Sequence, residues 1–347
     1  VYGATTGPLW PVRPEVMPLA EAVGLNILSF PGGEYGDTRD LQQFEIDNFI
    51  DLSRRLGAEP LIHVRLPGGS PEKAVAMLEY ANKTQGYGVK YWAIGNEPDL
   101  YAPRHTDFPW NPQTVAQEWR KIALAMKEAD PSILLVGPEI GNFAGTLDVR
   151  DWELEKVAYL EEFLRLNADL VDIVSIHRYP FPADAGNPVT TPLDDLRTNP
   201  REWDSRIIPD LRELMREVAG REFPIAVTEV NSHWSKIIRR DTSPDSLANA
   251  IWWGDVLMRM IRQKVDIVTF WSLVTGSDQG GWGMLDRYEE RPVYHTFVLF
   301  SRFGQELLHA ASGNEEVNVI AARRADGALT LMISNMSLEP QMVTLTL

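Results

Sequence analysis

Residues 89–100 of this 347-residue chain read VKYWAIGNEPDL, and the fold can be worked out from this stretch. Its first half is a run of apolar, β-branched and aromatic residues, which is typical of a buried strand. A glycine then breaks the run and a proline follows, so Asn96 and Glu97 fall where the strand ends. A glutamate in such a place is often only the first polar residue of a loop. At the mouth of a parallel barrel, however, strand ends hold the side chains that carry out chemistry.

Residues 224–232, PIAVTEVNS, repeat this pattern, with a short apolar run that ends at Glu229. Two carboxylates at the ends of two separate strands are the groups that hydrolysis of a glycosidic bond requires. One protonates the leaving oxygen, and the other attacks the anomeric carbon or activates a water molecule. The two stretches together therefore predict a site for carbohydrate chemistry.

The rest of the chain alternates between strand-like and helix-like segments. The strand-like segments are residues 1–5, 25–30, 60–66, 89–94, 133–137, 171–176, 225–229 and 266–272. The helix-like segments are 14–23, 40–56, 70–84, 114–129, 154–166, 205–219, 246–263 and 293–310. This alternation predicts an α/β protein whose parallel strands close into a (β/α)₈ TIM barrel. An open doubly wound sheet is the alternative, but no G-x-G-x-x-G loop follows the first strand.

After residue 312 the pattern changes to three short alternating strands, at 317–321, 329–334 and 341–347. Asp326-Gly327 is typical of a hairpin turn between the first two of them. We therefore expect a catalytic barrel over residues 1–311. Residues 312–347 are expected to form a small antiparallel β appendix, part of a β-sandwich.

Composition limits the classes of partner and cofactor. A formal net charge of −16 argues against nucleic acids and anionic membranes as partners. The absence of cysteine excludes disulfides, thiol catalysis and cysteine-bound metals. The six histidines show no His-x-His pair of the kind that metal-dependent barrel hydrolases carry. No metal or organic cofactor is expected, because two carboxylates and a water supply everything that the displacement needs. No signal peptide or transmembrane segment is apparent, and neither the compartment nor the oligomeric state can be predicted.

The two glutamate motifs resemble those of glycoside hydrolase clan A, whose members are retaining (β/α)₈-barrel glycosidases. In that clan an Asn-Glu pair, often within GNEP, ends strand four and a glutamate ends strand seven. The resemblance implies that Glu97 is the general acid/base and Glu229 the nucleophile. It also implies that Asn96 hydrogen-bonds the 2-hydroxyl of the sugar. For the acid/base role we expect the neighbouring carboxylate to raise the pKa of Glu97.

The same resemblance points to further residues at strand ends. His177 and Tyr179, in IHRYP after strand six, occupy places where relatives line the sugar site and hydrogen-bond the nucleophile. Trp271, at the end of strand eight, is where the clan often has a tryptophan under the sugar, and aromatic faces suit the apolar faces of sugar rings. A surface histidine and a core tryptophan are the simpler readings of these positions.

Three residues are weaker candidates for contact with the substrate. His63 lies near the end of strand three, and Trp282 lies in a glycine-rich loop that could cap the site. Glu139, after strand five, is a third strand-end carboxylate and the main rival of Glu229. Because the clan has no catalytic acid there, a substrate contact or a structural role is expected for it.

The chain departs from the clan at strand two, where Ser29 stands in place of an arginine that supports the nucleophile in several families. Either another residue such as Arg65 supplies that charge, or the nucleophile is tuned differently. The sequence is most similar to the α-L-arabinofuranosidases and to the endoglucanase–xyloglucanase family, and VTEVNS resembles heparanase-type β-glucuronidases. Family assignment within the clan therefore stays open.

The prediction is a retaining O-glycoside hydrolase that acts on plant or microbial oligo- or polysaccharides by double displacement. Two glutamates reaching inward across a small barrel favour the short carboxyl separation that retention requires. The sequence does not distinguish an exo-acting arabinofuranosidase, xylosidase or glucuronidase from an endo-β-glycanase. A barrel that binds carbohydrate without cleaving it is the other alternative.

Overall fold

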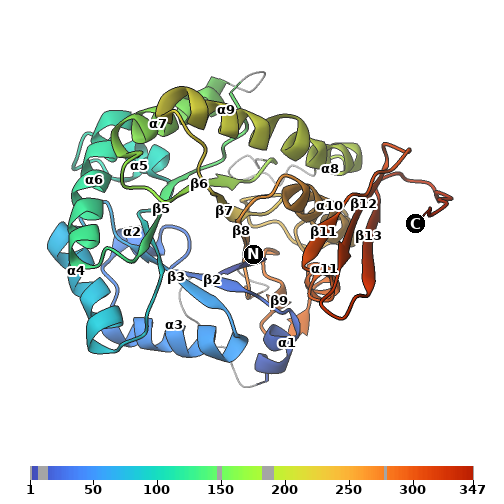
Figure 1. Ribbon diagram of the computed structural model, residues 1–347, viewed down its shortest axis with the longest axis horizontal. Coiled ribbons are helices and arrows are strands. Elements are labelled where there is room, and N and C mark those ends of the chain that lie inside the picture. Colours follow the sequence, from blue (N-terminus) through green and yellow to red (C-terminus); the bar gives the residue numbers. More distant parts are fainter. Residues whose placement is uncertain (1, 7–14, 147–150, 182–190, 277–279, 347) are drawn as a thin grey trace.

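Eight parallel strands, β1 to β8, close into a barrel in the computed structural model, and their order around the barrel follows the sequence (Figure 1). The structure describes residues 2–6, 15–146, 151–181, 191–276 and 280–346. The barrel strands are β1 (Tyr2–Thr5), β2 (Ile27–Phe30), β3 (Glu59–Val64), β4 (Tyr91–Ile94), β5 (Leu134–Ile140), β6 (Ile173–Arg178), β7 (Ile225–Val230) and β8 (Ile267–Trp271). The predicted TIM barrel is therefore confirmed.

The helices surround this barrel (Figure 1). They are α1 (Met17–Ala22), α2 (Tyr35–Thr38), α3 (Gln43–Leu56), α4 (Pro71–Glu79), α5 (Tyr101–Arg104), α6 (Pro112–Ala129), α7 (Asp151–Asn167), α8 (Leu193–Thr198), α9 (Ile208–Ala219), α10 (Leu247–Arg262) and α11 (Pro292–Phe300). Short helical turns adjoin them at η1 (Tyr80–Thr84), η2 (Pro98–Leu100), η3 (Asn199–Arg201) and η4 (Trp203–Ile207). No helix in the described ranges is long and apolar enough to cross a membrane.

Two apolar clusters result from the alternation of side chains along each strand. The larger one lies between the strands and the helices and includes Trp92, Trp119 and Phe270, all fully buried. The smaller one fills the inside of the barrel with one residue from each of seven strands: Ile27, Leu61, Ala93, Val136, Ile173, Ala226 and Ile267. A packed interior of this kind closes the barrel below the strand ends and leaves the chemistry to the mouth.

A three-stranded antiparallel sheet follows the barrel, in the order β11 (Glu306–Leu308), β12 (Val317–Arg323) and β13 (Leu329–Asn335). It lies beside α10 and α11 (Figure 1). Asp255 of α10 accepts hydrogen bonds at Oδ1 from Asn318 Nδ2, at 2.8 Å, and from Ser334 Oγ, at 2.5 Å. The appendix is therefore attached to the barrel by a buried polar network. The division of the chain at 311/312 stays a prediction.

Several predicted elements differ from the structure. The last helix was expected over 293–310 but ends at Phe300, and part of the remainder forms β11. The strand expected over 341–347 is wrong for residues 341–346, which are irregular, and Leu347 lies outside the described residues. The hairpin of β9 (Leu285–Asp286) and β10 (Glu289–Glu290) was not predicted. Pro14, the expected first residue of a helix, also lies outside the described residues.

Candidate active site

Glu97 follows β4 in the left-handed backbone region, with φ 46° and ψ 58°. Its N–H donates a hydrogen bond to the carbonyl oxygen of Glu139 on β5, at 3.1 Å. The preceding Gly95 has φ 80°, and a Cβ atom there would lie 2.5 Å from Tyr101 Oη and 2.8 Å from Leu66 Cβ. Only glycine fits this position. The break after the apolar run thus turns Glu97 away from the direction of the strand.

Glu229 is on β7 and is held through both carboxylate oxygens. Oε1 accepts a hydrogen bond from the backbone N–H of Gly33, at 2.9 Å, and Oε2 accepts one from the hydroxyl of Tyr179, at 2.8 Å. Gly33 has φ 63°, and a Cβ atom there would lie 3.2 Å from the ring of Trp271. The loop after β2 and the end of β6 therefore fix the orientation of Glu229.

The two glutamates face each other at short range. One oxygen of each carboxylate and one ring nitrogen of His177 all lie within 4.8 Å of one another. Retaining glycosidases hold their two carboxyl groups about 5–5.5 Å apart, whereas inverting enzymes need about 6.5–9.5 Å to fit a water molecule. The observed geometry falls on the retaining side.

His177 lies among three carboxylates that come from three different strands. Its Nδ1 is 3.3 Å from Glu97 Oε1 and 3.8 Å from Glu229 Oε2, and its Nε2 is 2.9 Å from Glu139 Oε2. Both His177 and Glu139 are fully buried, so this histidine does not lie on the surface. Burial opposes a charge on the imidazole. The negative charge of Glu229 and the hydrogen bonds to Glu139 and Glu97 outweigh it and raise the pKa of His177 well above its usual value.

The pKa values of the two facing glutamates differ from the expected order. Burial acts to raise the pKa of Glu97, but the hydrogen bond and charge of His177 outweigh it and lower that pKa below its usual value. Burial raises the pKa of Glu229 to about 7. The charge of His177 lowers this pKa, and the negative charge of Glu97 raises it. The expected rise on Glu97 is thus found on Glu229 instead. His177 is the physical reason, since its Nδ1 lies closer to Glu97.

Two further charged side chains support Glu97, and the sequence pattern indicated neither. Asp37, in the short helix α2, accepts hydrogen bonds at Oδ2 from the N–H of Asn96, at 3.0 Å, and from the hydroxyl of Tyr101, at 2.7 Å. Burial raises the pKa of Asp37 to about 7. This carboxyl group anchors the backbone immediately before Glu97.

The second support is a buried ion pair between Lys156 of α7 and Asp99 of η2. Asp99 Oδ1 also accepts a hydrogen bond from the N–H of Gly141, at 2.7 Å. The charge of Lys156 adds to the lowering of the pKa of Glu97. Since Lys156 lies on an outer helix, no local signal in the sequence links it to the mouth.

The remaining predicted residues lie at varying depth around this centre. Asn96 is buried, and its Oδ1 has no hydrogen-bond partner in the part of the chain that is described. His63 is buried against Ser29, with Nε2 2.8 Å from Ser29 Oγ. Trp271 is partly exposed beside Gly33, as noted above. Trp282 is also partly exposed and donates its indole N–H to the carbonyl oxygen of His233, at 3.0 Å.

The arginine that the sequence lacks at strand two is not replaced by Arg65. Its Nε donates to the carbonyl oxygens of Asp37 and Pro67, at 3.0 and 2.5 Å. The backbone N–H of Gly33 contacts Glu229 instead. A neutral N–H donor lowers the pKa of a buried carboxyl group less than a guanidinium would. This agrees with the raised pKa of Glu229. A different cation, Arg104, lies 3.8 Å from Glu97 Oε2 and 2.7 Å from Glu34 Oε1.

The ligand types at this centre are also those that divalent metals accept. Glu97, His177 and Glu229 each offer one atom to a common point. Both oxygens of Glu229 already accept hydrogen bonds from protein donors, and His177 is held by carboxylates on both ring nitrogens. A metal would have to compete with these contacts. The arrangement is better suited to moving protons between carboxyl groups.

Comparison with known proteins finds glycoside hydrolases among the proteins similar to this chain. A model of glycoside hydrolase family 44 matches residues 71–180, which is less than half of the chain. A β-xylosidase from Geobacillus stearothermophilus is 26% identical over 272 residues, or 72% of this chain and 48% of the relative. An intracellular exo-α-(1→5)-L-arabinofuranosidase from Streptomyces lividans is 22% identical over 431 residues, or 94% of this chain and 60% of the relative. The chain thus spans about half the length of the curated relatives it matches.

Solved structures share the barrel. A family 51 α-L-arabinofuranosidase from Bifidobacterium longum superposes with a TM-score of 0.73 at 15% identity, covering 97% of this chain and 82% of that one. A family 44 xyloglucanase from Paenibacillus polymyxa gives a TM-score of 0.69 at 16% identity, covering 96% and 84%. At these identities the likeness shows the fold. Together with the family model and the curated relatives, it means that this chain fits clan A of the glycoside hydrolases.

Proposed function

We propose that this chain is a retaining glycoside hydrolase in which Glu229 is the nucleophile and Glu97 the general acid/base. The observation that carries the proposal is the separation of the two carboxylates, with one oxygen of each within 4.8 Å of the other. The contacts of Glu229 with Gly33 and Tyr179 suit a nucleophile, because two neutral donors fix the orientation of its oxygens. Glu97 is the residue with hydrogen-bond access to a proton donor, His177.

In the first step Glu229 attacks the anomeric carbon while Glu97 gives its proton to the leaving oxygen. The bond between the sugar and its leaving group breaks, and an ester to Glu229 forms. In the second step Glu97 takes a proton from water, and the oxygen of that water displaces Glu229. The sugar leaves with its original anomeric configuration, and both carboxyl groups return to their starting state.

The proton that Glu97 requires is stored at His177. In the free enzyme the imidazole holds it, with Glu139 on the far ring nitrogen at 2.9 Å. The contact between Nδ1 and Glu97 Oε1, at 3.3 Å, is the path by which the proton reaches the acid. Because the carboxylates and the imidazole share protons, the set titrates as a unit. Glu139, the rival of Glu229 in the sequence, therefore acts on Glu97 through His177.

The substrates we propose are plant or microbial polysaccharides, or oligosaccharides derived from them. The relatives are named as xylosidases, arabinofuranosidases and a xyloglucanase, so xylose- and arabinose-containing substrates come first. A barrel that binds such sugars without cleaving them is the competing function. Aryl β-xyloside, aryl α-L-arabinofuranoside and soluble xyloglucan form the first panel to assay.

The roles of the two glutamates can be tested by substitution. Glu97→Gln and Glu229→Gln should each reduce kcat by at least about three orders of magnitude. Azide should restore activity to a glycine variant at Glu229 with inverted product, and to one at Glu97 with retained product. Glu217→Gln, on the exposed side of α9, is the matched control and should keep full activity. Near-normal turnover in either site variant would remove that residue from the mechanism.

Two further measurements complete the test. Proton NMR of the first-formed product should show the retained anomer, and early appearance of the inverted anomer would overturn the assignment of Glu229. Activity should survive extensive chelation. Loss on chelation that one divalent ion restores would instead make Glu97, His177 and Glu229 metal ligands.

A further inference from the structure

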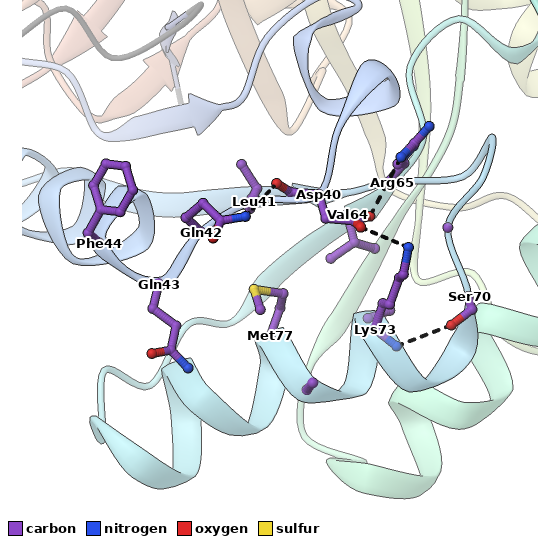
Figure 2. Close-up of a pocket in the computed structure, with 13 residues that line it drawn as sticks. Asp40, Leu41, Gln42, Gln43, Phe44, Val64, Arg65, Ser70, Lys73 and Met77 are labelled. Carbon is purple, nitrogen blue, oxygen red and sulfur yellow. Dashed lines mark hydrogen bonds and ion pairs between the residues drawn. The ribbon is translucent and has the colours of Figure 1, made fainter.

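A second hollow lies on the outer rim of the barrel, between the beginnings of α3 and α4 and beside the end of β3 (Figure 2). Its volume is about 620 Å³, which is within the usual range of ligand pockets, about 300–1,000 Å³. We call it the rim groove. It is lined by Asp40, Leu41, Gln42, Gln43, Phe44, Val64, Arg65, Gly69, Ser70, Lys73, Ala74, Ala76 and Met77. None of the nine residues predicted for the active site belongs to it.

Both cations of the rim groove, Lys73 and Arg65, lie beside the same carboxylate, Asp40. Lys73 Nζ lies 2.8 Å from Asp40 Oδ2, and Figure 2 shows this side chain rising from α4 toward Asp40. Arg65 lies 3.9 Å from the other oxygen of the same carboxylate. Two cations against one carboxylate leave the lining with one net positive charge, and Lys73 and Asp40 form a neutral pair within it. Paired charged groups can still donate and accept hydrogen bonds, as a neutral polyhydroxylated ligand requires.

The apolar part of the lining suits the same kind of ligand. Phe44 is 62% exposed at the first turn of α3, and Met77 of α4 lines the same hollow. Aromatic rings pack well against the C–H faces of sugars. Gln42 and Gln43 are exposed next to Phe44 and add amide donors and acceptors. An aromatic face beside amides and a neutralised ion pair is the combination that a neutral sugar ring can use.

The rim groove is connected to the active site by a short chain of contacts. Arg65, in its wall, donates to the carbonyl oxygen of Asp37, at 3.0 Å. The carboxylate of Asp37 in turn accepts from the N–H of Asn96, at 3.0 Å, next to Glu97. Both sites lie at the carboxyl ends of the strands, because Arg65 follows β3 directly and Glu97 lies just beyond the end of β4. The rim groove and the two glutamates therefore lie at the same end of the barrel.

We propose that the rim groove binds a neutral sugar unit of a polysaccharide whose cleaved bond lies between Glu97 and Glu229. This inference rests on the proposed glycosidase function and adds a substrate class to it. The substrate is a polymer long enough to extend from the active site past the end of β3 to the rim groove. Short aryl glycosides would not reach the groove. The groove should therefore affect polysaccharides only.

The test compares a polymer with a short substrate in two variants of the groove. Phe44→Ala and Lys73→Met should each raise KM for soluble xyloglucan by about fivefold, the size expected for loss of one aromatic or hydrogen-bonding contact. The same variants should leave kcat/KM on an aryl glycoside unchanged within about twofold, because that substrate ends at the mouth. Leu299→Ala, at a side chain of α11 that is 55% exposed, is the control and should change neither value.

Binding without turnover separates this proposal from the proposed function. Glu229→Gln should be retarded in gels that contain xyloglucan, arabinoxylan or linear arabinan, and adding Phe44→Ala should weaken that retardation. Absence of retardation with all three neutral polymers would overturn the groove even if the enzyme cleaves aryl glycosides. Equal losses on polymer and aryl glycoside in the groove variants would also overturn it. If retardation depends on Phe44 but the unchanged protein hydrolyses none of the substrates, sugar binding at the rim groove is supported and the proposed glycosidase function is wrong.

Discussion

At His177 a single imidazole is shared by carboxylates from β4, β5 and β7. A fully buried carboxylate is costly unless a positive charge accompanies it. Glu139 has that partner at His177 Nε2, and its pKa falls to about 2 although burial alone would raise it. The hydrogen bond and charge of His177 and the charge of His63 account for this. At the scale of single residues, the charge of the site therefore depends on three carboxylates and the one proton on His177 that they share.

Glu139→Gln tests this balance. Without the charge of Glu139, fewer negative charges face the imidazole, so the pKa of His177 falls. The proton shared by His177 and Glu97 is then bound less tightly. The alkaline limb of the kcat/KM profile should move to lower pH, while the acid limb changes less. The measurement is a pH profile on an aryl glycoside, with thermal unfolding recorded alongside. An unchanged alkaline limb in a folded variant would remove His177 as the proton store.

Tyr179→Phe addresses the acid limb. The nucleophile must be ionised, and the pKa of Glu229 is about 7, so kcat/KM should rise as pH increases through that value. The hydroxyl of Tyr179 lowers this pKa by donating to Oε2. Without this hydroxyl the pKa of Glu229 rises and the acid limb moves to higher pH. If that pKa rises by one unit, kcat/KM at pH 6 should fall by about tenfold. Tyr80→Phe, at a hydroxyl bonded to Asp47 near the end of α4, should leave the profile unchanged.

Glu97 and Glu229 could be predicted because their signal is local: each follows a short apolar run, and parallel strand ends converge at one mouth. The lowered pKa of Glu97 could not. It depends on His177, Arg104 and Lys156, which lie at other places in the sequence. Asp37 was missed for the same reason, since a carboxyl group in a Gly-rich loop has no local feature that links it to Asn96.

At the scale of elements, β6 continues two residues further than its apolar run indicated, to Arg178. The apolar pattern ends at Ile176, but His177 stays in the strand because it pairs with Glu229 of β7, after a shift in register between Ile176 and His177. Polar residues at the end of a strand are paired by the barrel, not by their own propensity. The active-site histidine was therefore expected just after the strand, whereas the structure places it within the strand.

The link between α7 and η2 gives a prediction at this scale. Lys156 and Asp99 are both buried, so removing the lysine leaves a carboxylate without a charge partner. Lys156→Met should lower the free energy of unfolding by about 3–5 kcal/mol. Urea unfolding at neutral pH measures this. Adding Asp99→Asn to this variant should recover part of the loss. If the double variant loses as much stability as Lys156→Met alone, packing of the lysine stem matters more than its charge.

At the scale of the whole molecule, the appended sheet and the barrel share one polar network. Asp255 accepts from Asn318 and Ser334 and also pairs with Arg259, at 2.7 Å. The second part of this interface is Arg197 of α8, which lies 2.8 Å from Glu316. These contacts join β12 and β13 to two different helices. We expect the sheet and the barrel to unfold together.

Asp255→Ala should break this connection. It leaves two buried donors, Asn318 and Ser334, without their acceptor and removes one of the two carboxylate partners of Arg259, for an expected loss of about 3–5 kcal/mol. Calorimetry should show one transition for the unchanged chain and a lower, broader or split transition for the variant. Asp326→Ala, in the exposed turn between β12 and β13, is the control. Two transitions in the unchanged chain would mean that the sheet is an independent unit.

The appended sheet also shows where the sequence stops being informative. Short alternating runs predicted β12 and β13. In the structure most residues of β12 are buried, whereas Ser334 is the one buried residue of β13. The same alternation over 341–346 gave no strand, since no neighbouring strand in the described part of the chain pairs with it. β11 was taken for the end of a helix because its residues, Glu306–Leu308, favour helices as readily as strands. Pairing partners decide such short elements.

The loop after β2, together with α2, contacts Glu229 and two neighbours of Glu97 within a few residues: Gly33 donates to Glu229, Glu34 pairs with Arg104 beside Glu97, and Asp37 holds Asn96. Its length is therefore tied to the relative placement of the two reacting groups. An insertion or deletion inside it would shift the donors of nucleophile and acid together, and no single compensating substitution could restore both. In evolutionary terms, this barrel can acquire new substrates by changing its other mouth loops, while the loop after β2 keeps its length.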